Sequence, residues 1–371
     1  MSGQKISQMQ IICIGVCNLM GTIIISAYVS SVLRHEAWIA GILGFIANLP
    51  TLFIYCALTK KYPGKGLFQI NEAVFGTATG RLISGVYLLF FFSVCALNVL
   101  EATNFLTFFI LPNTSRLAIA ALLAAGCVYC VKKGILPLAR ASAFFLIITC
   151  AVMLLYGAMT LVNAKFEYLL PLFSHRPLDY IQSTHIAASI PFGESIFLLM
   201  LIPDADKKVS VKKTYFAVSA AAALIMVFVH VRETVALGPM AAFSTLPTYE
   251  AARLVNIPGV LTRIESVFAL VLIMLNLFKV IVLFYICVSG IKRVALTESQ
   301  SYIVMLGFLL VICAITTYVS PVSNIFFGKN VSPFIWSFFT LALPFLTLVA
   351  AVIRTAATRH FGRTHKNRAT Q

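Results

Sequence analysis

The stretch Ser189-Ile190-Pro191-Phe192-Gly193-Glu194-Ser195 decides how this chain is interpreted. It lies in an apolar run, about 185–202, that is long enough to cross a bilayer. Pro191 has no backbone N–H, Gly193 lowers helix stability, and Glu194 brings a carboxyl group to the membrane centre. A break frees backbone groups, which a membrane tolerates only where they face a cavity or a ligand. The stretch predicts a discontinuous spanning helix that forms a binding site. The structural alternative is a proline-kinked helix with a protonated, paired Glu194.

The composition places the chain in a bilayer. Of its 371 residues, 60% are hydrophobic and 11% are charged, too few polar residues to cover a soluble domain of this size. The first apolar run is too long for a signal peptide. The nine cysteines lie inside apolar runs, and an odd, membrane-buried set makes no disulfide framework. We expect an all-α polytopic membrane protein with ten spans, at 9–33, 38–59, 82–110, 116–131, 141–163, 185–202, 214–231, 262–288, 300–320 and 333–354.

The basic residues report the orientation of these spans. The formal net charge is +16, yet the lysines and arginines gather in the connections, which favours topology control over nucleic-acid binding. The N-terminus, the even-numbered connections and the C-terminus hold 19 of them, and the odd-numbered connections hold 8. The positive-inside rule then predicts that both termini are cytoplasmic, with 355–371 as a short basic cytoplasmic tail.

Span 1 is interrupted as span 6 is. The run Gly15-Val16-Cys17-Asn18-Leu19-Met20-Gly21-Thr22 places two glycines and an asparagine at mid-span. Spans 1 and 6 open two halves of five spans each, and an odd number inverts the second half. Paired breaks in inverted repeats indicate a transporter-type site at the midplane. We therefore expect one permease-like domain over 1–371, built as a 5+5 inverted repeat (9–163 and 185–354) of the LeuT or amino-acid-permease type.

The breaks suggest a class of ligand. Half-helix N-termini offer free N–H groups and partial positive charge to a carboxylate. Freed carbonyls and Glu194 offer acceptors to an ammonium group. A zwitterionic amino acid fits both, although an uncharged polyol could use the same groups. The ligand-binding candidates at the two breaks are Asn18, Gly21, Thr22, Pro191, Gly193, Glu194 and Ser195.

Three more polar residues lie inside spans. Asn98 and Glu101 share one face of span 3; Glu101 either lines a water-filled path or acts as interhelical hydrogen-bond glue. Lys279 lies roughly 14 Å from the cytoplasmic end of span 8, too deep for snorkelling. We expect it to pair with a carboxylate or with freed carbonyls near a break, where its ammonium could stand in for a coupling cation.

Signatures of enzymes and cofactors are absent from the sequence. It contains no G-x-x-x-x-G-K-[ST], no H-E-x-x-H, and no G-x-G-x-x-G after a strand. We therefore expect neither catalysis, nor a metal, nor a cofactor.

The chain resembles a known family at several of these positions. The residues Pro191-Phe192-Gly193-Glu194, followed by Pro203 and a lysine-rich loop, resemble span 6 of the spore-germination permeases, the B subunits of the Ger nutrient receptors. Further similar stretches are Thr248-Tyr249-Glu250-Ala251-Ala252-Arg253-Leu254-Val255-Asn256-Ile257, Arg263-Ile264-Glu265-Ser266, Phe278-Lys279 and Leu283-Phe284-Tyr285. The length and the ten spans agree as well.

The resemblance implies a multi-pass protein in the inner membrane of a bacterial endospore. It would sense a nutrient germinant, an amino acid for example, and assemble with an A-type membrane subunit and a C-type lipoprotein subunit. A proton- or cation-coupled amino-acid transporter and a gated conduit for water or ions are the alternatives. All three use one fold, and a fold does not determine function.

Overall fold

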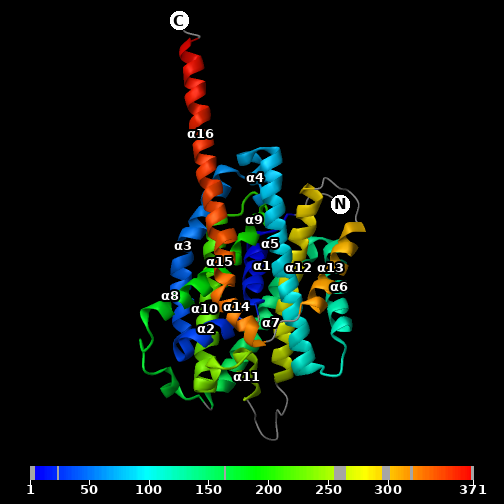
Figure 1. Ribbon diagram of the computed structural model, residues 1–371, viewed down its shortest axis with the longest axis vertical. Coiled ribbons are helices and arrows are strands. Elements are labelled where there is room, and N and C mark those ends of the chain that lie inside the picture. The colour runs from blue at the N-terminus through cyan, green and yellow to red at the C-terminus, as the bar shows by residue number, and fades with distance from the viewer. Residues whose placement is uncertain are drawn as a thin grey trace.

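The computed structural model describes residues 5–22, 25–162, 164–254, 265–294, 301–317 and 321–368, and these residues are nearly all helical. Most of the long helices run along one axis of an elongated bundle (Figure 1). Within the described ranges, the extended pairing is a single bridge between Ile6 and Ala205. The predicted all-α class is confirmed.

The first half of the chain begins with a capped helix. Ser7 caps α1, since its Oγ accepts from the backbone N–H of Gln10 at 3.3 Å and Gln10 Oε1 accepts from the N–H of Ser7 at 3.0 Å. The elements that follow α1 (Gln8–Met20) are α2 (Ile25–Leu33), η1 (Arg34–Glu36), α3 (Ala37–Lys61), α4 (Leu67–Phe75), α5 (Thr77–Phe105), η2 (Leu106–Ile110), α6 (Arg116–Lys133), α7 (Ile135–Leu161) and η3 (Phe166–Leu169).

The second half begins with an interrupted helix. It comprises α8 (Pro177–Ala187), η4 (Ala188–Phe192), η5 (Gly193–Phe197), α9 (Leu198–Leu201) and η6 (Ile202–Asp204). The rest comprises α10 (Val211–Leu237), η7 (Gly238–Ala242), α11 (Pro247–Arg253), α12 (Glu265–Val294), α13 (Ser301–Thr316), α14 (Pro321–Asn330), α15 (Ser332–Ser337), η8 (Phe338–Ala342) and α16 (Leu343–Arg368). Between the spans, α4 and α11 are short helices of 9 and 7 residues.

Seven helical segments among the described residues are long and apolar enough to cross a membrane, against ten predicted spans. One of the seven joins α2 and α3 through η1, where Arg34 has a φ of 48° and the chain turns. The apolar helices α1 and α13 are shorter, with 13 and 16 residues. The break in span 1 explains part of the difference between the ten predicted spans and the seven among the described residues. Span 1 is divided into α1 and α2, and neither helix alone is long enough to cross a membrane. The division into repeats at 9–163 and 185–354 stays a prediction.

Contacts between distant segments define the two ends of the bundle. At one end, backbone bonds of 2.9 Å join Ile6 to Asp204 and Asp206. At the same end, Arg354 Nη1 donates to the carbonyls of Ala73 and Val74 at 2.8 Å, and Figure 1 shows α4 at the upper end and α11 at the lower end. The first described residues, the connection after span 6 and the start of the C-terminal tail therefore lie on one side.

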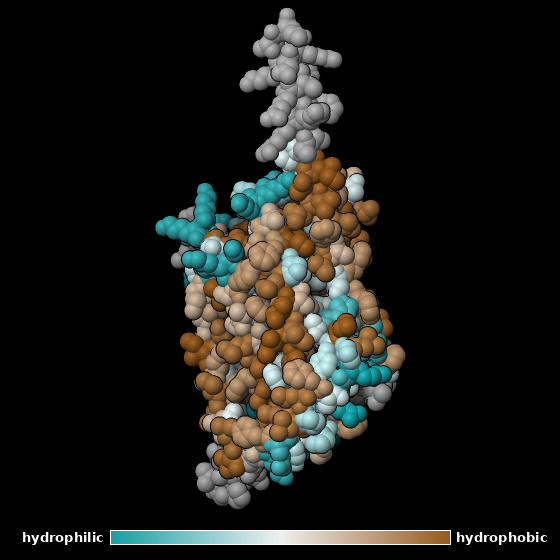
Figure 2. All heavy atoms as spheres, turned by 90° about the vertical axis from the view of Figure 1, so that its left-hand side faces the viewer, coloured by the Kyte–Doolittle hydropathy of each residue, from teal (hydrophilic) through white to brown (hydrophobic). Residues whose placement is uncertain are grey.

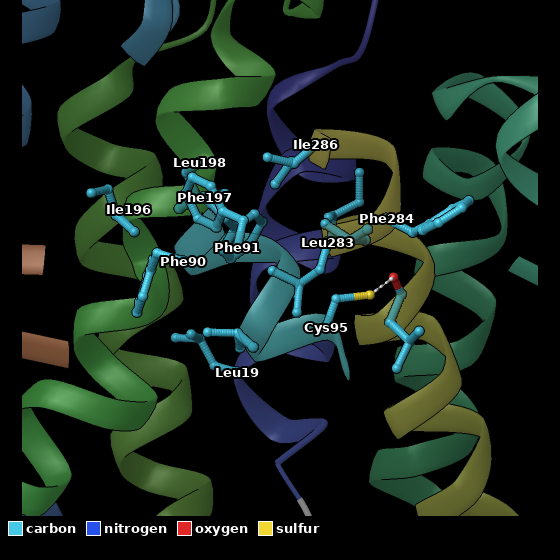
Figure 3. Close-up of a cluster of buried hydrophobic side chains, with 14 of the residues drawn as sticks. Leu19, Phe90, Phe91, Cys95, Ile196, Phe197, Leu198, Leu283, Phe284 and Ile286 are labelled. Atoms are coloured by element: carbon cyan, nitrogen blue, oxygen red, sulfur yellow. Dashed lines mark hydrogen bonds between the residues drawn. The ribbon is translucent and has the colours of Figure 1, made fainter. Parts of the chain in front are cut away.

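The interior is apolar, and two spans dominate it. In the most apolar window of 177–204, 78% of the residues are buried, and in that of α12 72% are, against 28% for α7. Figure 3 shows the centre of this core, where Cys95 Sγ donates to the carbonyl of Val280 at 3.6 Å. The labelled side chains come from α1, α5, η5, α9 and α12: Leu19, Phe90, Phe91, Cys95, Ile196, Phe197, Leu198, Leu283, Phe284 and Ile286.

The outer surface suits a bilayer. Figure 2 shows hydrophobic residues over most of one flank, with hydrophilic residues gathered toward the upper end and along one edge. Large apolar side chains such as Leu82, Leu122 and Leu224 are 70–74% exposed on α5, α6 and α10. Contact of so many apolar side chains with water would cost free energy, whereas contact with lipid tails would not.

Candidate functional site

The break in span 1 lies after Met20. The N–H of Gly21 bonds to the carbonyl of Asn18 at 3.2 Å and ends α1, and helix resumes at Ile25. Residues 23 and 24 lie outside the described ranges. The end of α1 leaves carbonyls without helical partners, and the start of α2 leaves N–H groups. The predicted discontinuity is therefore present, at the C-terminal end of the stretch that indicated it.

The break in span 6 is a change of helical pitch. The chain passes from α8 into one wide π-type turn over Ala188–Phe192 and then into tight 3₁₀ turns over Gly193–Phe197. Pro191 lacks the N–H that would continue an α-helix, which accounts for the change. Gly193 itself has φ −63° and ψ −35°, ordinary helical values. The break therefore does not depend on a dihedral angle that only glycine allows.

Gly193 and Gly21 instead allow helices to approach closely. A Cβ on Gly193 would lie 2.8 Å from Thr340 Oγ1 in η8, and one on Gly21 would lie 2.7 Å from Lys279 Cβ in α12. The carbonyl of Gly193 also accepts from Tyr55 Oη at 3.4 Å. Both missing side chains thus face protein atoms. Close packing of neighbouring helices therefore accounts for glycine at both positions, and binding of a ligand by Gly21 and Gly193 stays a prediction.

The buried charges of the two halves meet. Lys279 Nζ lies 2.6 Å from Glu194 Oε2, with side-chain exposures of 0% and 5%. Lys279 also donates to Thr22 Oγ1, and Trp336 Nε1 donates to Glu194 Oε1 at 3.0 Å. The indole ring of Trp336 packs edge to face against the ring of Phe90, with 5.5 Å between the ring centroids. The expected pairing of Lys279 with a carboxylate is confirmed, and the partner is Glu194 at the break in span 6.

An amide pair extends this cluster to span 3. Asn276 Nδ2 lies 3.2 Å from the carbonyl of Gly21 and 3.3 Å from Asn98 Oδ1. Asn98 in turn donates to the carbonyl of Val94 at 2.8 Å. The sequence interpretation missed Asn276 and Trp336. Asn276 could have been found, because it lies one helical turn before Lys279 on the same face, whereas no local pattern marked Trp336.

The remaining predicted residues lie outside this hydrogen-bonded cluster. Within the described residues, the amide of Asn18, Ser195 Oγ and Glu101 Oε2 are buried and have no hydrogen-bond partner. The cluster therefore contains Gly21, Thr22, Asn98, Glu194 and Lys279, but not Glu101. Arg263, part of a stretch quoted above, lies outside the described ranges.

A cavity of about 80 Å³ lies beside the two breaks. Of the ten predicted site residues, Thr22 and Pro191 line it. A cavity needs about 10–15 Å³ of such volume to hold one water molecule, so this one has room for a small ligand. Its lining comes from both breaks and from α7, α10, α11 and α12: Leu19, Met20, Thr22, Ile25, Ser26, Met153, Pro191, Phe192, Ala222, Ile225, Met226, Val229, His230, Thr248 and Leu272.

One wall of this cavity carries polar residues that the sequence interpretation missed. His230 and Glu233 lie in the last turns of α10, each 1% exposed, with Nδ1 of His230 3.4 Å from Oε2 of Glu233. Glu233 also accepts from Ser26 Oγ at 2.5 Å and from Thr248 Oγ1. The predicted span ended at 231, which placed Glu233 in a connection. The spacing of His230 and Glu233, three residues apart at a span end, was the available signal.

Comparison with known proteins identifies the family. The family model described as spore germination protein matches residues 5–325, most of the chain. The chain belongs to the spore germination protein family. The predicted family is therefore confirmed, and the family is one of permease-like or receptor-like proteins rather than enzymes.

Curated members of the family resemble the chain over most of its length. Spore germination protein KB of Bacillus subtilis (strain 168) is 27% identical over 340 residues, which cover 87% of this chain and 88% of that protein. Spore germination protein YndE of the same strain is 24% identical, with coverage of 85% and 86%. Spore germination protein XB of Bacillus anthracis is 23% identical, with coverage of 85% and 88%.

Solved structures with a similar fold are transporters. The crystal structure of MhsT in complex with L-phenylalanine has a TM-score of 0.66 at 15% identity, covering 95% of this chain and 99% of that one. Mhp1, a nucleobase-cation-symport-1 family transporter with bound bromovinylhydantoin, has a TM-score of 0.62 at 13% identity, covering 97% and 94%. This family member therefore has the expected LeuT-type transporter fold.

Proposed function

We propose that the chain is the nutrient-sensing B subunit of a spore germinant receptor. It binds a small nutrient, an amino acid, in the cavity beside broken helices 1 and 6, and the bound nutrient triggers germination. The observation that carries this proposal is the cavity itself, which Thr22 and Pro191 line from the two breaks. Relatives named for spore germination support the biological role.

The cavity suits a small zwitterion. Its volume of about 80 Å³ favours a small ligand. Ile25, the first described residue of α2, lines the cavity, and the N–H groups and partial positive charge of a helix N-terminus suit a carboxylate. Leu19 and Met20, the last residues of α1, also line the cavity, and the last carbonyls of a helix have no helical partners and can act as acceptors. Aliphatic side chains over most of the remaining wall favour a ligand with a small apolar side chain.

Thr22 connects the cavity to the buried ion pair. Its side chain lines the cavity and accepts from Lys279, which pairs with Glu194. A ligand that bonds to Thr22 therefore changes the surroundings of a charge pair that holds α12 against span 6. Because the pair is buried, small changes in its geometry carry a large energy. This route gives a bound nutrient a physical means of changing the helix arrangement.

The direct test fills the cavity. Ala222 lines it from α10, whereas Ala220 on the same helix is exposed on the outer surface. We expect Ala222→Leu to abolish binding of small L-amino acids and the germination response, at protein abundance near wild type. Ala220→Leu, the matched control, should leave both unchanged. A normal dose–response in Ala222→Leu spores would show that the nutrient binds elsewhere.

Location, orientation and partners are part of the same proposal. The protein lies in the inner membrane of the endospore with both termini cytoplasmic, beside an A-type membrane subunit and a C-type lipoprotein. The basic asymmetry of 19 to 8 supports this orientation. A cysteine at Phe243, which is 83% exposed, should be labelled from outside, and one at Lys207 should not. The reverse pattern would contradict the orientation.

Transport is the second candidate function, because the solved structures with a similar fold are transporters. A transporter would move the nutrient across the bilayer, and coupling to protons or cations would make uptake depend on their gradients. Proteoliposomes containing the purified chain distinguish the two functions. Sensing predicts saturable binding without uptake, and transport predicts accumulation of radiolabelled amino acid that Ala222→Leu abolishes.

A further inference from the structure

The expected acceptor for the ligand's ammonium group is already engaged. Glu194 was the carboxylate predicted to meet it, but both of its oxygens have partners, Lys279 at 2.6 Å and Trp336 at 3.0 Å. Glu194 is also absent from the cavity lining. An ammonium group would have to displace a fixed ammonium at close contact in order to reach it. A second carboxylate, that of Glu233, lies behind the opposite wall of the cavity.

The carboxylate of Glu233 is surrounded by hydrogen-bond donors and by His230, whose Nδ1 lies 3.4 Å away. Two hydroxyls donate to it, Ser26 Oγ at 2.5 Å and Thr248 Oγ1. The adjacent Arg232 turns elsewhere, since Nη2 donates to the carbonyl of Thr248 at 2.9 Å and the guanidinium lies 4.9 Å from the ring of Phe268. Among the described residues, Arg232 and Glu233 form no ion pair.

The residues between Glu233 and the cavity present acceptors. Ser26 and Thr248 line the cavity, and each donates its hydroxyl hydrogen to Glu233. The lone pairs of the two hydroxyl oxygens therefore remain free to accept from a ligand. His230 also lines the cavity, and its Nδ1 lies 3.4 Å from Glu233 and is buried without a hydrogen-bond partner in the described chain. A hydrogen on Nδ1 facing the carboxylate leaves Nε2 as a further acceptor.

We propose that this wall, Ser26, His230 and Thr248 backed by Glu233, is the subsite for the ammonium group of a small zwitterionic amino acid. The inference rests on the proposed function, and it states which wall of the cavity binds the ammonium end of the ligand and which binds the carboxylate end. Ser26, His230 and Thr248 line the same cavity and can accept from the three N–H donors of an ammonium group, and the carboxylate behind them supplies the counter-charge. The carboxylate of the ligand then points toward Thr22 and the start of α2. Thr22 has a hydroxyl hydrogen to donate, because its oxygen accepts from Lys279.

A purely structural role for Glu233 predicts different behaviour. The carboxylate also joins α10 to α2 and α11 through Ser26 and Thr248, so its removal could loosen the bundle. Loosening lowers protein abundance and weakens all ligands alike. Loss of an ammonium subsite weakens only ligands that carry the ammonium group. The ratio of affinities for a matched ligand pair therefore separates the two roles.

The test compares L-alanine with L-lactate, in which a hydroxyl replaces the ammonium group, and L-valine with its α-hydroxy analogue. Equilibrium binding is measured on the full chain in nanodiscs. We expect the wild type to prefer each amino acid over its hydroxy analogue at least tenfold. In Glu233→Gln the affinity for the amino acid should fall about 10- to 100-fold, with the hydroxy acid changed less than threefold. A wild type that binds neither amino acid, or that binds both members of a pair equally, would overturn the proposal.

Further variants keep the result interpretable. His230→Gln should lower the same preference by several-fold, and it replaces Glu233→Gln if that variant does not fold. His185→Gln is the matched control, because His185 lies in α8 outside the cavity lining, 2.8 Å from Ser337 Oγ, and it should keep the wild-type preference. If Ala222→Leu abolishes binding while Glu233→Gln and His230→Gln keep the preference, the subsite is wrong and the cavity stands. If Ala222→Leu binds normally, the proposed function fails as well.

Discussion

Removing one partner of the buried ion pair should destabilise the protein severely. Lys279→Met keeps the length of the side chain and removes its ammonium group, which lies 2.6 Å from Glu194 Oε2. The carboxylate is then left 5% exposed, with the indole N–H of Trp336 as its remaining partner among the described residues. An uncompensated buried charge costs about 3–5 kcal/mol, so we expect the free energy of unfolding to fall by about that amount.

The double variant tests whether the cost comes from the orphaned charge. Glu194→Gln alone should also destabilise, because it leaves the ammonium of Lys279 buried with only the hydroxyl of Thr22 and the new amide. Lys279→Met combined with Glu194→Gln removes both charges and should recover at least about 2 kcal/mol of the summed single costs, since contacting residues are not additive. Lys213→Met, at an exposed position near the start of α10, should change stability by less than about 0.5 kcal/mol.

Unfolding by increasing SDS in mixed micelles, followed by tryptophan fluorescence, measures all four variants. Single variants that each cost less than about 1 kcal/mol would refute the assignment of a buried charge pair. So would single costs that add within about 0.5 kcal/mol in the double variant, because additivity means that the two side chains do not interact. Either result would leave Lys279 without the structural role given to it here.

Three further variants test neighbouring contacts. Trp336→Phe removes the N–H that donates to Glu194 at 3.0 Å together with part of the buried indole ring, and it should cost at least about 1.5–3 kcal/mol in the same titration, followed by the fluorescence of Trp38; an unchanged stability would contradict this bond. Gly193→Ala places a methyl group 2.8 Å from Thr340 Oγ1, so we expect weaker expression and response, partly rescued by Thr340→Ala; failure of the rescue would point to another cause. Glu101→Gln should disturb release or permeation with ligand affinity within about twofold of wild type if Glu101 lines a polar path. Lower protein abundance alone would identify it as interhelical glue.

Local features of the sequence predicted the fold and the positions of both breaks. Pro191 predicted the change of pitch because the missing N–H acts within its own helical turn. The depth of Lys279 in an apolar span predicted a carboxylate partner, because an unpaired ammonium at that depth is too costly. Gly193 shows the limit of such reasoning. The sequence made Gly193 a candidate for ligand binding, but it could not show that the atom closest to a side chain there belongs to Thr340 in η8, 147 residues away along the chain.

Composition and local spacing were enough to predict that the chain crosses a membrane, where its spans break, and which family it belongs to. These properties depend on composition and on spacing within one helix, which short windows contain. The tertiary structure alone decided that Glu194 faces Lys279 and that Ser26, His230 and Thr248 gather around a cavity beside Glu233. Those residues come from separate helices, and their meeting depends on the crossing of packed helices, which no single window records. Helix packing determines which polar groups pair in a membrane, because a buried polar group must bond to a neighbouring helix where no water is available.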